Sequence, residues 1–315
     1  MEAVFLDQNG PRLTEHPEPA PSQDTAIVRV HLAGICNTDL ELVKGYMKFE
    51  GILGHELVGS VVDGPAAWIG ARVVAEINFA CGRCRACAMG LGRHCPSRRV
   101  MGILNADGAF AERVAVPLSN LHRVPDDMTD ETAVFSEPLA AAFEILEQVH
   151  VDAATDCVVL GDGKLGLLAA QVLYQAGARV LAVGKHESKL EILKRRGIAV
   201  TTLDEWKGEV ADLVVEATGT AAGFQTAVAA TRPRGTLVLK STAATGTQLN
   251  LAPLVINEIT VVGSRCGSFA PALRALRVGG IDVRSLIAHR LSLHDALRGL
   301  ELAAIPGTLK VLIEP

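Results

Sequence analysis

A glycine-rich turn between a strand pattern and a helix pattern constrains this chain more than any other feature. The apolar run 157–160 predicts a fully buried strand, and the apolar stretch 167–173 predicts a helix. Between them, residues 161–166 read Gly-Asp-Gly-Lys-Leu-Gly. In this setting the first glycine permits a sharp turn, the second lets the backbone approach a pyrophosphate, and the third lets the helix pack on the strand. The stretch therefore predicts a dinucleotide site at a helix N-terminus.

The segments that follow this turn alternate between strand and helix patterns. Strand patterns cover 178–183, 199–203, 212–217, 235–240 and 259–263, and helix patterns lie between several of them. Such alternation is typical of a Rossmann domain, an α/β fold with a doubly wound parallel sheet. Thr218 follows one of these strands, so we expect it to border the cofactor.

The end of the second strand bears on which cofactor is bound. An acidic residue is expected about 20 positions after the glycine turn when the cofactor is NAD, but the strand ends in Gly184 and is followed by cationic residues. Glycine leaves room for a 2′-phosphate and cations attract it, which favours NADP(H) over NAD(H). The alternative is that these cations are ordinary surface residues and that Glu187 takes the acidic role. The predicted cofactor-binding residues are Gly161, Gly163, Lys164, Leu165, Gly166, Gly184, Lys185, His186, Lys189 and Thr218.

Four of the seven cysteines lie within fifteen residues of one another, at Cys81, Cys84, Cys87 and Cys95. This spacing predicts a closed tetrahedral zinc site, which is structural because it leaves no position for a substrate. A [4Fe–4S] cluster uses a similar spacing, but the longer gap before Cys95 argues against it. His94 is an alternative ligand, although four thiolates already complete the shell.

A second group of metal-ligand residue types is spread along the chain. Cys36 follows a strand pattern, His55 and Glu56 precede another, and Glu137 stands in an apolar neighbourhood where a carboxylate must be paired, protonated or metal-bound. Catalytic zinc takes three protein ligands and keeps one position open. From these residues alone, Cys36 could equally be a small buried hydrophobe and Glu137 an ordinary acid at a helix N-terminus.

Composition excludes several other classes of protein. The net charge of −5 argues against nucleic acids or anionic membranes as main partners, and no run of 18 apolar residues predicts a membrane span. The first residues do not resemble a signal peptide, and an odd number of crowded cysteines favours metal ligation over disulfides. We therefore expect a cytoplasmic protein that acts on a small molecule.

With these motifs in view, the chain resembles the zinc-dependent medium-chain alcohol and polyol dehydrogenases. The resemblance covers essentially the whole chain and rests on motifs in the family's order: GICNTDLEL, GHELVG, the four-cysteine lobe, DGAFAE, SEPLA and LGDGKLG. It implies a mainly β, GroES-like catalytic domain over 1–140 that contains the zinc lobe 81–95. A Rossmann domain over 141–267 follows, and the tail 268–315 returns to the catalytic domain, with the active site between the domains. The family also implies a homodimer or homotetramer formed through the strand at 259–263.

The resemblance also implies roles for individual residues. Cys36, His55 and Glu137 would hold a catalytic zinc ion, with Glu56 behind the metal and able to enter its shell. Thr38 matches the hydroxyl that binds the substrate oxygen and passes on its proton. Glu41 stands where many members have a relay histidine, so the resemblance does not assign the proton route beyond Thr38. The implied activity is reversible oxidation of an alcohol to a carbonyl by a nicotinamide cofactor. The alternatives are an aldose 1-dehydrogenase and a non-catalytic protein that binds zinc and a dinucleotide.

Overall fold

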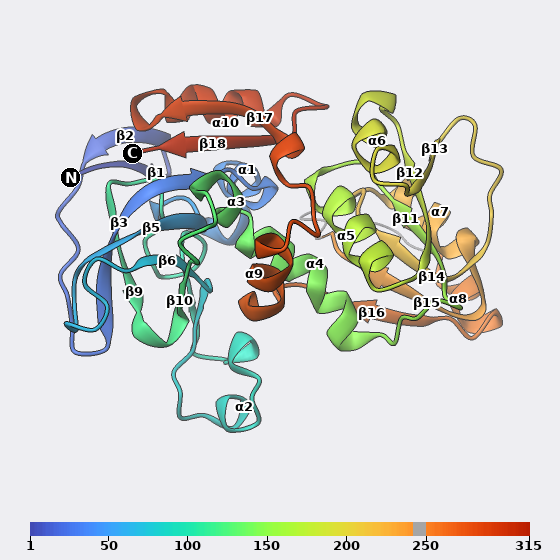
Figure 1. Cartoon of the computed structure of the whole chain (residues 1–315), viewed down its shortest axis with the longest axis horizontal. Helices are drawn as coiled ribbons and strands as arrows, with labels where there is room; N and C mark the ends of the chain where they lie inside the picture. The colour runs from blue at the N-terminus through green and yellow to red at the C-terminus, as the bar shows by residue number, and fades with distance from the viewer. Residues whose placement is uncertain (242–249) are drawn as a thin grey trace. The chain divides into compact units, whose positions relative to one another are not determined.

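The computed structural model describes residues 1–241 and 250–315, and this part of the chain divides into two compact units (Figure 1). The first unit combines Met1–Glu137 with Ala272–Val278 and Leu286–Pro315. The second combines Pro138–Pro271 with Gly279–Ser285. Among the described residues, no helix is both long enough and apolar enough to cross a membrane.

The first unit is built mainly from antiparallel strands. Its largest sheet has the order β10-β6-β5-β3-β18-β17, with β9 also paired to β3, and smaller sheets have the orders β2-β1-β4 and β7-β8. The strands are β1 (Glu2–Asp7), β2 (Gly10–Glu15), β3 (Thr25–Gly34), β4 (Gly51–Ile52), β5 (Glu56–Asp63), β6 (Arg72–Ala75), β7 (Asn78–Phe79), β8 (Arg99–Val100), β9 (Arg113–Pro117), β10 (Leu121–Arg123), β17 (Ile287–Ser292) and β18 (Lys310–Glu314). The helices are α1 (Asn37–Val43), α2 (Arg85–Ala88), α3 (Asp130–Ala133), α9 (Phe269–Arg277, whose first residues belong to the second unit) and α10 (Ala296–Ala304).

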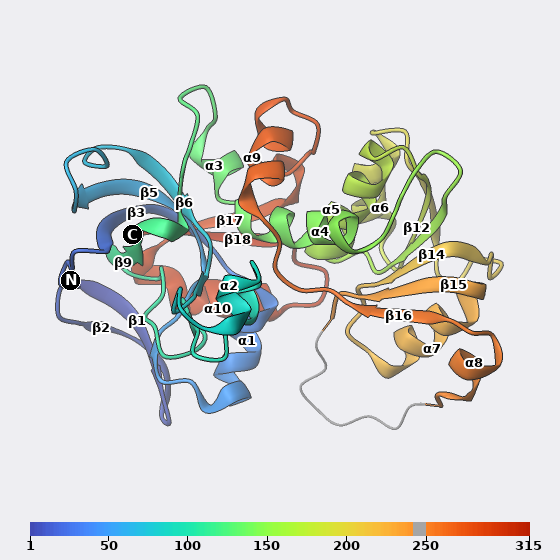
Figure 2. The ribbon, with the colours of Figure 1, turned by 90° about the horizontal axis from the view of Figure 1, so that it is seen from below.

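The second unit is a parallel sheet with helices on both faces. The strand order is β13-β12-β11-β14-β15-β16, and Figure 2 shows α5 and α6 on one face and α7 and α8 on the other. The strands are β11 (Asp156–Leu160), β12 (Arg179–Gly184), β13 (Ala199–Thr202), β14 (Ala211–Glu216), β15 (Thr231–Leu239) and β16 (Thr260–Gly263). The helices are α4 (Ser136–Gln148, which starts in the first unit), α5 (Lys164–Gln175), α6 (Glu187–Lys194), α7 (Ala221–Ala230) and α8 (Ala252–Ile256). This arrangement confirms the predicted doubly wound fold.

The sequence of the central strand β11 is continuously apolar because both of its faces are buried. Helices cover both faces of the sheet, so side chains that point to either face are buried. The run from Cys157 to Leu160 is at most 3% exposed. Burial without a charged partner also raises the pKa of the Cys157 thiol, which makes this cysteine a packing residue.

Candidate metal centres and dinucleotide site

Strand register brings the first candidate metal centre together. Strand β3 pairs with β5 so that Gly34 faces Glu56, and β18 pairs with β3 so that Leu312 also faces Gly34. The chain leaving β3, the chain entering β5 and the start of β18 therefore meet at one end of the sheet. Gly34 permits this closeness, because a Cβ there would lie 2.2 Å from Glu56 Oε2.

Cys36, His55 and Glu56 meet at this end of the sheet and form a possible metal site. One ligand atom from each lies within 4.8 Å of the others, and both His55 and Glu56 are buried. Among the described residues, Glu56 Oε1 is buried without a hydrogen-bond partner. A cation would satisfy that oxygen, and a thiolate, an imidazole and a carboxylate together form a donor set that zinc accepts.

Asp39 orients this group, although the sequence analysis did not select it. Its Oδ2 accepts the N–H of Cys36 at 2.8 Å, which caps helix α1, and its Oδ1 faces His55 Nδ1 at 3.2 Å. With Nδ1 directed at a buried carboxylate, Nε2 is the nitrogen left for a metal. The sequence signal was the capping pattern itself, an acidic residue three positions after the residue that precedes the helix.

The charges around His55 decide its protonation in the absence of a metal. Burial by itself lowers the pKa of His55, but the carboxylate of Asp39 and the sulfur of Cys36 raise it, and the net result is a pKa well above the ordinary value. A proton and a metal ion therefore compete for this imidazole.

Glu56 is held from the other side by Lys310, the second residue that sequence analysis did not identify. The Lys310 ammonium donates to Glu56 Oε2 and, at 3.2 Å, to the carbonyl oxygen of Ile35, and both charged side chains are almost fully buried. Burial lowers the pKa of Lys310, but Glu56 and neighbouring anionic groups raise it above its ordinary value, so Lys310 keeps its ammonium charge. Nothing in the local sequence distinguishes Lys310 from any other lysine at the start of a strand.

Two further predicted residues lie near this group. Thr38 Oγ1 is 3.7 Å from Cys36 Sγ, so its hydroxyl is beside the candidate metal position. Glu137 is not in the group of three that share a 4.8 Å neighbourhood, but its carboxylate acts on the charge of Lys310. Glu41 is paired with the exposed Lys44 at 2.9 Å, at the surface of the same helix as Thr38.

The four clustered cysteines form the second candidate metal centre, in a lobe that projects from the first unit near α2 (Figure 1). Their sulfurs are 3.5 Å apart for Cys84 and Cys87, 3.8 Å for Cys84 and Cys95, and 4.0 Å for Cys81 and Cys87. A tetrahedron of thiolates around zinc has edges of about 3.8 Å, given Zn–S bonds of about 2.3 Å. A hydrogen bond from the backbone of Arg83 lowers the pKa of the Cys81 thiol to about 6, which favours the thiolate. These distances fit a single tetrahedral ion, whereas a cluster would place each thiolate on a different iron.

The glycine turn has the shape of a dinucleotide site. A Cβ on Gly166 would lie 2.0 Å from the carbonyl oxygen of Gly161, so only glycine allows α5 to pack there. Around Gly163, the residue preceding α5, a Cβ would meet no described atom within 4 Å. That open space lies beside the N–H groups of the first turn of α5, where a pyrophosphate would bind. Lys164 and Leu165 open α5 and are partly exposed.

The other predicted cofactor residues lie at the neighbouring strand ends. Gly184 ends β12, and Lys185, His186 and Lys189 lie around the carboxylate of Asp162. Thr218 follows β14, and both its N–H and its hydroxyl donate to the buried Glu216, at 2.7 and 2.5 Å. Glu216 thereby shapes the loop that borders the glycine turn, since a Cβ on Gly161 would lie 3.2 Å from the Thr218 nitrogen.

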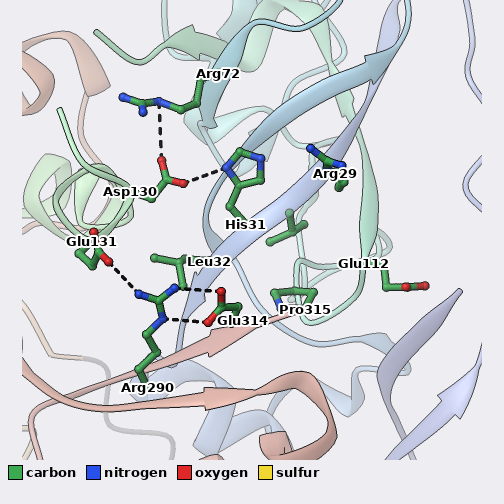
Figure 3. A pocket seen from close by; sticks show the side chains of 11 residues that line it. Arg29, His31, Leu32, Arg72, Glu112, Asp130, Glu131, Arg290, Glu314 and Pro315 are labelled. Atoms are coloured by element: carbon green, nitrogen blue, oxygen red, sulfur yellow. Dashed lines mark hydrogen bonds and ion pairs between the residues drawn. The ribbon is translucent and has the colours of Figure 1, made fainter. Parts of the chain in front are cut away.

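A polar pocket of 650 Å³ lies elsewhere on the first unit and is lined by residues of β3, α3 and the chain's last strands (Figure 3). His31 Nδ1 is 2.9 Å from Asp130, and Arg290 pairs with Glu131 at 2.8 Å and with Glu314 at 2.9 Å. These ion pairs neutralise part of the pocket's charge, and the predicted site residues are not among those that line it.

Comparisons with known proteins identify two family profiles in this chain. Residues 22–126 match a family profile described as the alcohol dehydrogenase GroES-like domain, and residues 165–278 match one described as zinc-binding dehydrogenase. A sorbitol dehydrogenase from Halalkalibacterium halodurans is 27% identical, with 100% of this chain and 99% of that protein covered.

Solved structures extend the similarity to the whole fold. A putative zinc-binding dehydrogenase from Sinorhizobium meliloti bound to NADP is 28% identical with a TM-score of 0.91, and the match covers 100% of this chain and 99% of that one. An alcohol dehydrogenase from Escherichia coli complexed with NADH is 25% identical, also with a TM-score of 0.91 and the same coverage. Relatives of this chain therefore include structures with either nicotinamide cofactor.

Proposed function

The chain belongs to the zinc-binding alcohol and polyol dehydrogenases, which are oxidoreductases, and on this premise we propose that it interconverts a polyol-like alcohol and its carbonyl compound. The observation that carries the proposal is the group of Cys36 and the buried His55 and Glu56, with Asp39 behind it. A zinc ion held there supplies Lewis acidity toward an alcohol oxygen. A non-catalytic protein would not need to keep such a donor set beside the Thr38 hydroxyl.

The side chains of this site have separate tasks in the proposal. Cys36 and His55 would hold the metal, Glu137 would complete the ligand set as the resemblance implies although it lies outside the group of three, and Asp39 fixes the imidazole of His55. Lys310 donates to Oε2 of Glu56, so that Oε1 of this carboxylate, behind the metal, would be able to enter its shell. Thr38, beside Cys36, would hydrogen-bond the substrate hydroxyl and pass its proton on toward solvent, and a bound nicotinamide cofactor would supply the hydride acceptor. The four-cysteine lobe holds a second zinc ion that stabilises its loop.

Metal content and activity of Glu137→Ala test the ligand assignment. We expect the variant to lose about one of two zinc equivalents and nearly all activity toward a panel of polyols, aldoses and simple alcohols. Glu147→Gln is the control, because Glu147 is an exposed acid on the same helix α4 as Glu137. A Glu137→Ala protein with full zinc and full activity would refute the assignment. The same panel separates a polyol dehydrogenase from an aldose 1-dehydrogenase.

We further propose a cytoplasmic homodimer or homotetramer. Strand β16 lies at the edge of its sheet and is largely exposed, with Val261 40% exposed. Val255 and Ile256 at the end of α8 are each 77% exposed. Within the described part of the chain, an edge strand beside exposed apolar side chains is suited to pairing with a second copy. The cytoplasm suits the metal sites, since their thiols must stay reduced.

A further inference from the structure

The acid that the sequence lacks at the end of β12 is supplied from elsewhere in the structure. Rossmann sites for NAD place a carboxylate at this strand end, where it binds the ribose 2′-hydroxyl. Here the strand ends in Gly184, and a Cβ on this glycine would lie 2.6 Å from Asp162 Cβ and 2.8 Å from Asp162 Oδ2. The carboxylate of Asp162, from the glycine turn, therefore lies where the side chain of a strand-end acid would begin.

Asp162 already engages the groups that the sequence assigned to a 2′-phosphate. Its Oδ2 accepts the N–H groups of Lys185 and His186, both at 2.7 Å, and faces His186 Nδ1 at 2.8 Å. Its Oδ1 accepts Lys189 Nζ at 3.3 Å, and Lys189 is only 8% exposed. Two of the three predicted cations are thus directed at this carboxylate.

The carboxylate remains an anion in this position. Burial raises the pKa of Asp162, but hydrogen bonds from His186 and the charge of Lys189 outweigh that effect and hold the pKa below the ordinary value. Among the described residues, Oδ1 accepts from Lys189 only, so one of its lone pairs is left for another donor. A ribose hydroxyl can use that lone pair, whereas a phosphate dianion would be repelled by the carboxylate and could not donate to it.

We propose that Asp162 is the residue that selects the cofactor, and that it favours NAD(H) over NADP(H). Asp162, which lies in the glycine turn between β11 and α5, replaces the acid that is missing at the end of β12. This inference rests on the proposed dinucleotide site and reverses the preference that Gly184 and the following cations suggest in the sequence.

Binding of ADP-ribose and its 2′-phosphorylated form, measured by calorimetry, tests this proposal without any turnover. We expect the unmodified protein to bind ADP-ribose at least about tenfold more tightly, and Asp162→Asn to reduce that ratio about tenfold or more. Glu187→Gln, which alters the exposed acid one residue into α6, is the matched control and should leave the ratio unchanged. Melting temperatures verify that each variant is folded.

A second variant keeps the test informative if Asp162→Asn does not fold. His186→Asn removes the imidazole and leaves the carboxylate, so the preference for ADP-ribose should persist. If cations selected NADP, this variant would instead lose affinity for the phosphorylated ligand alone. Tighter binding of the phosphorylated form by the unmodified protein, or a shift in Glu187→Gln but not in Asp162→Asn, would overturn the inference. Binding of neither ligand would overturn the proposed function with it.

Discussion

Asp39 links helix α1 to a metal ligand, because its two carboxylate oxygens face partners from different segments. One oxygen accepts the Cys36 N–H at 2.8 Å, and the other faces His55 Nδ1 at 3.2 Å. The residue is fully buried, so its charge acts in a medium of low dielectric constant. Its position explains how a single short helix can fix both a thiolate and an imidazole.

We predict that Asp39→Asn weakens zinc binding at the Cys36 site about 10- to 100-fold while the lobe keeps its metal. The amide can still accept the Cys36 N–H, but it no longer offers His55 a negative charge. Competition with a chromophoric chelator measures both affinities on one sample. Glu41→Gln on the same helix should match the unmodified protein, and equal zinc affinity in Asp39→Asn would show that the carboxylate has no positioning role.

We also predict that zinc uptake at this site depends steeply on pH. The pKa of His55 is raised in the metal-free protein, so the stabilisation from its protonated form is complete below about pH 6.5 and is lost as pH rises through the raised value. Zinc must displace that proton, and its affinity therefore keeps increasing with pH until the raised pKa is passed. Calorimetry in buffers of different ionisation enthalpy counts the protons released. In His55→Asn the count should fall by about one, and an unchanged count would contradict the prediction.

At the scale of elements, the turn from β11 to α5 separates a folding requirement from a binding requirement. Gly166 is needed for packing, since a Cβ there would overlap the backbone of Gly161. Gly163 has φ −75°, which any residue can adopt, and a Cβ there would meet open space within the described structure. The two glycines of one motif thus serve different purposes.

A matched pair of alanine variants checks this distinction. Gly166→Ala should lose about 1–3 kcal/mol of unfolding free energy from overpacking. Gly163→Ala should unfold like the parent protein but bind ADP-ribose at least about tenfold more weakly, because the methyl group occupies the space for the pyrophosphate. Urea unfolding and calorimetry measure the two quantities. Equal losses of stability in both variants would contradict the assignment.

At the scale of the whole molecule, the exposed edge of the second unit predicts self-association. Val261→Lys on β16 should convert the oligomer into a folded monomer, since a lysine on an edge strand opposes strand pairing. Light scattering after size-exclusion chromatography measures the mass. Val210→Lys is the control, because Val210 is 61% exposed but outside the edge strand. A monomeric parent protein, or dissociation in both variants, would argue against this interface.

The last strand of the chain pairs with a strand near its beginning. Strand β18, at residues 310–314, pairs with β3, whose last residue Gly34 also faces Glu56. The end of the chain therefore supplies Lys310 to a site that the first sixty residues begin. A pairing across almost the full length of the chain cannot be read from local patterns, because only the sheet register sets it.

The sequence by itself determined the features that depend on residues close together in the chain. The doubly wound fold followed from alternating strand and helix patterns, and the cysteine lobe and glycine turn followed from short spacings whose geometry the backbone fixes within a few residues. Only the tertiary structure decided that Asp39 and Lys310 flank the metal residues and that Asp162 occupies the place beside Gly184. The physical reason is that these contacts join separate segments, and strand register and side-chain packing, rather than spacing along the chain, determine which atoms meet.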